Sequence, residues 1–138
     1  MNIEDSPLDE WIDTLKPYQK STIRALTNQC SEEETAKKWL SAQGPSSTVG
    51  FGGVSNPEPF FDRFMEEFRK FICGDEAYED FRKQLGAESP VVKTIYVSVI
   101  STALGATLGY TATLLAPAVA VLLHLVGKMG VNAWCAAS

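Results

Sequence analysis

The sequence lacks the residue combinations on which most enzyme active sites depend. Its 138 residues include a single histidine, His124, which has no acidic neighbour in the sequence. A Ser-His-Asp or Cys-His nucleophile system therefore has no support, and metal sites built on several histidines are excluded. No glycine-rich phosphate-binding motif occurs either. We expect no catalytic, cofactor-binding or metal-binding residues, and a protein that is not an enzyme.

The sequence also lacks the cysteine spacings of disulfide-rich or zinc-binding proteins and the apolar region of a signal peptide. The three cysteines, Cys30, Cys73 and Cys135, are odd in number and widely separated, with no CxxC or zinc-ligand spacing. This usage predicts no disulfide framework and indicates a reducing cytoplasm for the water-exposed part. The N-terminal stretch MNIEDSPLDEW is acidic and contains no apolar region, so we do not expect a secretory signal peptide.

The charge is unevenly distributed along the chain, and no basic stripe is present. Residues 1–88 contain all 17 acidic residues and 10 of the 12 basic ones, a net charge of −7. Residues 89–138 contain only Lys93 and Lys128. A nucleic-acid partner is not expected, because phosphates require clustered Lys and Arg. The chain therefore divides into an acidic, charged region and a region almost without charge.

Residues 1–88 show helical periodicity and no strand alternation. Apolar residues recur every three or four positions, and six of the seven phenylalanines lie between residues 60 and 81. This pattern predicts a bundle of about five short amphipathic helices, with a flexible Gly/Pro/Ser-rich loop at residues 44–59. We expect its all-α core to contain the aromatic residues Trp11, Trp39, Phe61, Phe64, Phe68, Phe71 and Phe81.

Residues 94–127 contain no Asp, Glu, Lys or Arg. The length of residues 89–138 allows a hydrophobic helical hairpin with candidate transmembrane segments at 90–112 and 117–137, joined by a turn near residues 113–117. Small residues repeat every four positions, a spacing that favours close helix packing in lipid. These packing residues are Ser101, Gly105, Gly109 and Thr113, and the candidate anchors at the lipid interface are Lys93, Tyr96, Tyr110 and Trp134.

His124, Lys128 and Asn132 are spaced by four within the second segment. Polar groups in a membrane segment usually face a cavity, a partner or water, so this face is a candidate pore-lining or oligomer-facing stripe. The alternative is a helix end that emerges into the interface, where Lys128 extends toward water.

The sequence thus favours a small membrane-inserting or pore-forming effector or toxin-like protein. It would bind a protein partner through its acidic helical region and form a homo-oligomer in lipid, without cofactors. Basic residues before the hairpin and an uncharged turn predict both termini in the cytoplasm, at the inner or plasma membrane. The alternative is a soluble all-helical adaptor or regulatory subunit whose apolar hairpin is its buried core. An ordinary two-pass membrane protein is a third hypothesis.

Overall fold

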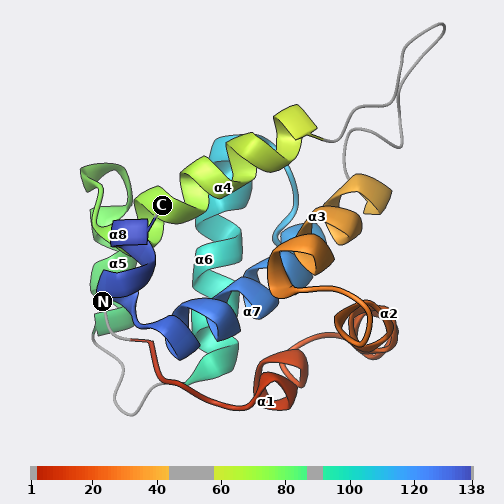
Figure 1. Cartoon of the computed structure of the whole chain (residues 1–138). Coiled ribbons are helices and arrows are strands. Elements are labelled where there is room, and N and C mark those ends of the chain that lie inside the picture. Colours follow the sequence, from red (N-terminus) through yellow and green to blue (C-terminus); the bar gives the residue numbers. More distant parts are fainter. Residues whose placement is uncertain (1–2, 44–57, 87–91, 138) are drawn as a thin grey trace, which may run out of the picture.

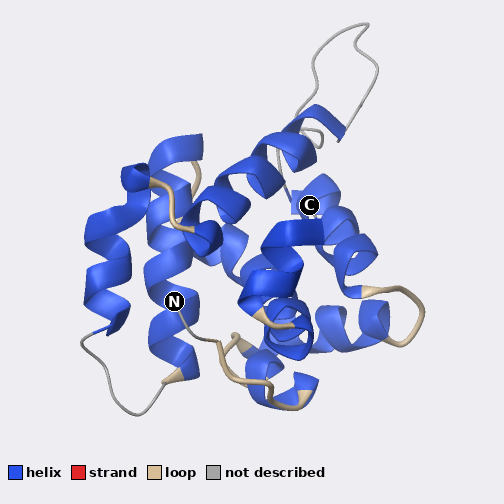
Figure 2. Cartoon of the chain, turned by 60° about the vertical axis from the view of Figure 1, so that its left-hand side comes forward, coloured by secondary structure: helices blue, strands red, loops and turns tan. Residues whose placement is uncertain are grey.

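The computed structural model describes residues 3–43, 58–86 and 92–137, and these residues form eight α-helices and no strand (Figure 2). The all-α prediction is confirmed. The helices are α1 (Leu8–Ile12), α2 (Pro17–Thr27), α3 (Glu32–Gln43), α4 (Glu58–Cys73), α5 (Glu79–Gly86), α6 (Lys93–Leu108), α7 (Ala112–Met129) and α8 (Val131–Ala137), with a short 3₁₀ turn at Glu76–Tyr78 before α5.

Several helices begin where a polar side chain satisfies a free backbone N–H group. The hydroxyl of Ser31 accepts from the N–H of Glu34 (3.3 Å) at the start of α3, because serine just before a helix is a favoured N-cap residue. The hydroxyl of Thr111 accepts from the N–H of Leu114 (3.3 Å) in the same way at the start of α7. Pro17 is the first residue of α2, where its missing N–H is harmless.

Helix α7 is the central element of the fold. It lies against α6 and α3 and also contacts α1 and α8 (Figure 1). Its side chains from Ala118 to Leu123 are completely buried, as are those of Leu115 and Val126. One buried cluster includes residues from the acidic region, such as Trp11 and Phe64, together with these residues of α7. The acidic and the charge-poor regions of the chain therefore share one core, of which α7 is the most buried helix.

The boundaries of the apolar helices differ from those expected. The turn between α6 and α7 lies at residues 109–111, not near 113–117, and Pro117 lies inside α7 instead of opening a helix. Gly109 ends α6 because it adopts a left-handed conformation, φ 84°, that residues with a Cβ rarely tolerate. The second segment is divided at Gly130 into α7 and α8.

Among the described residues, α7 is the one helix long and apolar enough to cross a membrane. Its 18 residues are 56% buried in the fold, and a core helix of a soluble protein meets the same criteria. Helix α6 is apolar but has only 16 residues, fewer than the roughly 20 that a spanning helix needs.

The prediction that no disulfide forms is wrong for one pair. Cys73 and Cys135 are bonded, with their Cα atoms 5.9 Å apart, whereas Cys30 is free. The two cysteines are 62 positions apart in the sequence, and no sequence pattern signals the pairing. The contact arises because the fold places the end of α4 against α8.

Candidate functional site

Pro117 interrupts the hydrogen bonding of α7, and a distant side chain supplies the missing donor, while a second one adds a contact to the same turn. Proline has no N–H, so the carbonyl of Thr113, four residues earlier, loses its helical donor. The buried amide of Gln19 in α2 donates to that oxygen (Nε2 to O, 2.9 Å). The indole of Trp39 in α3 donates to the next carbonyl, that of Leu114 (2.8 Å). The backbone of α7 at the proline is therefore completed by the amphipathic helices.

A charged cluster joins the C-terminal half of α7 to the start of α3. Glu32 Oε2 lies 3.0 Å from His124 Nδ1 and 3.0 Å from Lys128 Nζ. Partial burial would raise the pKa of Glu32, but the hydrogen bonds and charge of Lys128, with His124, outweigh it and lower that pKa. Two residues of the predicted polar face, His124 and Lys128, thus contact an acidic residue of α3. Asn132, the third, is exposed on α8.

A second polar network lies between α4, the turn before α5, and α6. The hydroxyl of Tyr78 donates to Glu67 (2.6 Å) and lies 2.9 Å from the hydroxyl of Thr107. Burial, and then the hydrogen bond to the Glu67 carboxylate, raises the pKa of Tyr78 to about 12. Glu67 also accepts from Lys70 (3.2 Å). These contacts attach α6 to α4 and to the turn before α5.

A groove of about 190 Å³ lies where α3, α4, α7 and α8 meet. Met65, Met129 and Trp134 provide apolar surface, and the side chain of Met129 is among the most exposed large apolar groups described. Glu33 and Arg69 are exposed and bring charges of opposite sign to the lining, which Ala137 completes. Within the described ranges, neither Glu33 nor Arg69 forms an ion pair.

The four residues of the predicted packing face have different surroundings. Gly105 faces the turn after α6, because a Cβ there would collide with the carbonyl of Tyr110. Its own carbonyl accepts from the N–H of Gly109 (2.8 Å) and of Tyr110 (3.0 Å), so both glycines take part in ending the helix. Ser101 is buried, and Thr113 is exposed.

The predicted interface anchors all contact protein. Lys93 pairs with Glu4 (3.5 Å) and Glu10 (3.2 Å), and its ammonium lies 5.5 Å from the centre of the Trp11 ring. Tyr110 packs edge-on against Phe60, and Trp134 packs edge-on against Phe68. Tyr96 is buried in the core.

Five of the seven predicted core aromatics are fully or almost fully buried, and two are partly buried. The buried ones are Trp11, Trp39, Phe64, Phe68 and Phe71, and the partly buried ones are Phe61 and Phe81.

Sequence reasoning missed Gln19, Glu32 and the groove, because their roles depend on contacts with residues more than 90 positions away or on four helices meeting. Pro117 was the one usable signal, since a proline inside a helix predicts that some donor must replace its N–H.

The described part of the chain contains no group of three or more His, Cys, Asp or Glu side chains that could hold a metal ion. No family model, curated protein or solved structure matches this chain.

Proposed function

We propose that this protein is a water-soluble helical interaction module, an adaptor or regulatory subunit without catalytic activity, whose apolar hairpin is its core. The observation that carries the proposal is the pair of hydrogen bonds from Gln19 and Trp39 to the carbonyls of α7 near Pro117. Helix α7 depends on donors supplied by α2 and α3.

The energetics favour retention of α7 within the fold. Transfer of α7 into lipid without α2 would leave the carbonyl of Thr113 without the donor from Gln19, and an unsatisfied backbone group in hydrocarbon costs several kcal/mol. The same transfer would separate His124 and Lys128 from Glu32. Both losses oppose release of the hairpin.

We assign partner binding to the groove formed by Glu33, Met65, Arg69, Met129, Trp134 and Ala137. Its apolar surface between two opposite charges suits a protein segment with one large apolar side chain. A basic group on that segment would face Glu33, which belongs to the acidic first turn of α3 with Glu32 and Glu34. An acidic group would face Arg69.

Peptide display against the oxidised full-length chain tests this assignment. We expect the selected peptides to combine a large apolar residue with a basic neighbour on one side and an acidic neighbour on the other. Met129→Glu should abolish their binding, and Glu33→Arg should weaken it at least about tenfold, since reversing one close charge exceeds 1.4 kcal/mol. Tyr18→Glu, at an exposed aromatic outside the groove lining, is the matched control and should bind normally. Peptides without this pattern, or peptides insensitive to Met129→Glu, would refute the groove assignment.

Membrane insertion is the second candidate function, favoured by the length and apolarity of α7. Flotation of the detergent-free chain with anionic and neutral vesicles separates the two proposals. We expect the chain to remain with the soluble fraction and to leave the vesicles sealed. Co-flotation that resists carbonate washing would overturn the soluble module in favour of insertion.

A further inference from the structure

The Cys73–Cys135 disulfide connects the last residue of α4 to α8. Cys73 is exposed and Cys135 is half-buried, so molecules in solution can approach the bond. Exposed disulfides are typically the ones that exchange with small thiols, whereas structural disulfides are usually protected. The exposed location of the disulfide is therefore typical of a bond that exchanges with small thiols as well as cross-linking α4 and α8.

Apart from the disulfide, helix α8 is held mainly by the burial of Trp134 and the partial burial of Val131. It has seven residues, far fewer than the roughly 12 at which an isolated helix becomes even marginally stable. Its buried side chain is Trp134, whose ring centre lies 5.6 Å from that of Phe68, while Asn132, Ala133 and Ala136 are exposed. Gly130, at φ 91°, separates α8 from α7. Helix α8 can therefore detach without disturbing the helix that precedes it.

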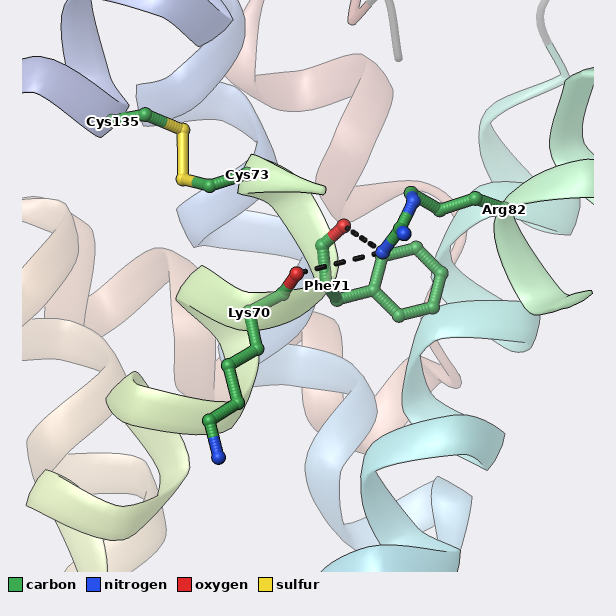
Figure 3. The surroundings of a disulfide bond; sticks show 5 residues. All are labelled: Lys70, Phe71, Cys73, Arg82 and Cys135. Carbon is green, nitrogen blue, oxygen red and sulfur yellow. Dashed lines mark hydrogen bonds between the residues drawn. A yellow bond between two sulfur atoms is a disulfide. The ribbon is translucent and has the colours of Figure 1, made fainter. Parts of the chain in front are cut away.

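The other end of the disulfide is fixed independently. The guanidinium of Arg82 donates to the carbonyls of Phe71 (3.1 Å) and Lys70 (3.5 Å) in the last turn of α4 (Figure 3). The N–H of Asp75 also donates to the carbonyl of Lys70 (3.0 Å). These bonds satisfy carbonyl groups that a helix end leaves free, so the position of Cys73 does not depend on the disulfide.

We propose that Cys73–Cys135 is a redox-active site that exchanges with low-molecular-weight thiols and acts as a latch on α8. A thiolate attacks the sulfur of the more exposed Cys73, forms a mixed disulfide with it, and releases Cys135 as a thiolate that takes up a proton. A second thiolate then displaces Cys73. The protein disulfide gains two electrons and two protons, and two small thiols are oxidised to one small disulfide.

Opening the latch changes the surface of the protein. Once α8 leaves, Phe68 loses the ring of Trp134 that covers it. Trp134 and Ala137 also line the groove, so reduction removes part of that lining. This last consequence rests on the proposed function, whereas the latch itself does not.

Hydrogen exchange of the full-length chain, read by mass spectrometry, tests the latch without reference to any partner. The chain carries Cys30→Ser, which removes the free thiol and prevents disulfide scrambling. After treatment with excess reduced glutathione, we expect amides of residues 131–137 to exchange at least about tenfold faster than in the oxidised chain. The amides of residues 118–126 in α7 should exchange at unchanged rates. Cys135→Ser in oxidising buffer should give the pattern of the reduced chain.

Three results would overturn the latch. A bond that resists excess reduced glutathione under native conditions would not be an exchange site. Equal protection of residues 131–137 in both states would show that α8 stays docked without the disulfide. Faster exchange throughout α7 would make the bond a support of the entire fold. Loss of peptide binding is not used as a readout, so failure of the groove assignment leaves this test intact.

Discussion

Replacement of Gln19 tests whether its side chain compensates for Pro117. Gln19→Met keeps the length of a buried side chain but removes its donor to the carbonyl of Thr113 and its acceptor for the N–H of Lys16 (3.2 Å). A net hydrogen bond contributes about 1 kcal/mol, so losing both should lower the free energy of unfolding by roughly 1–2 kcal/mol.

The diagnostic quantity is the dependence of that loss on Pro117. In a Pro117→Ala background, the new N–H of residue 117 can donate to the carbonyl of Thr113, as in any α-helix. Gln19→Met should then cost only what its contact with Lys16 contributes. We expect a coupling free energy of about 1 kcal/mol between the two changes. The coupling does not depend on whether Pro117→Ala alone stabilises the chain. The effect of Gln19→Met is measured once in the parent and once in the Pro117→Ala background, and the effect of Pro117→Ala cancels within the second comparison.

Urea unfolding followed by circular dichroism gives the free energies of unfolding of the parent, the two single variants and the double variant, all measured with the disulfide intact. Gln29→Met, at an exposed glutamine of the same type, is the matched control and should show no coupling to Pro117. If the effects of Gln19→Met and Pro117→Ala add within about 0.5 kcal/mol, the compensation argument is refuted.

Three further predictions concern the polar networks and the turn between α6 and α7. Because the pKa of Glu32 is lowered in the fold, its contribution is present above its usual value of 4.5 and is lost as pH falls through the lower folded value. Glu32→Gln should lower the free energy of unfolding at pH 7 by roughly 1 kcal/mol, a small value because the side chain of Lys128 is half-exposed. The variant should also lose less stability than the parent as the pH falls below about 4.5. Parallel plots of unfolding free energy against pH for the two chains would contradict this. The raised pKa of Tyr78, about 12, acts in the opposite direction: its contribution is complete below pH 10 and is lost as pH rises toward 12. Burial also raises the pKa of Tyr96, so ultraviolet titration should show more than one tyrosine ionising late, and Tyr78→Phe should remove one tyrosine from that late step. Gly105→Ala should lower stability by roughly 1–3 kcal/mol, because the added methyl group displaces the carbonyl of Tyr110, despite the higher helix propensity of alanine. The control is Gly109→Ala, where a Cβ would meet no neighbouring atom and only the left-handed backbone conformation would cost about 1–2 kcal/mol. A Gly105→Ala chain that melts at a higher temperature than the parent would disprove the steric argument.

Local patterns allowed prediction of the helices but not of their partners. The apolar periodicity of residues 60–72 predicts α4 and its buried face, including Phe64 and Phe68. Ser31 predicts the start of α3. These features depend on neighbours within one or two helical turns, so sequence is sufficient to find them.

The long-range contacts could not be predicted in this way. The bonds from Gln19 and Trp39 to α7 span 94 and 75 residues, and the disulfide spans 62. The Gly105–Gly109 spacing was ambiguous for another reason: two glycines four apart allow either close helix packing or a helix-ending turn. Sequence spacing alone does not distinguish these uses, because each requires the absence of a Cβ.

Apolar composition alone cannot decide whether α7 serves as a protein core or a membrane span, because both environments favour the same side chains. The backbone provides a stronger criterion. A carbonyl group that a proline frees needs a new donor in either environment, and in lipid that donor must come from the segment itself, from a neighbouring helix or from an ordered water. At Pro117, α7 uses Gln19 from α2 and Trp39 from α3. Any model of membrane insertion must therefore include a new donor for the carbonyl of Thr113, or the transfer of α2 along with α7.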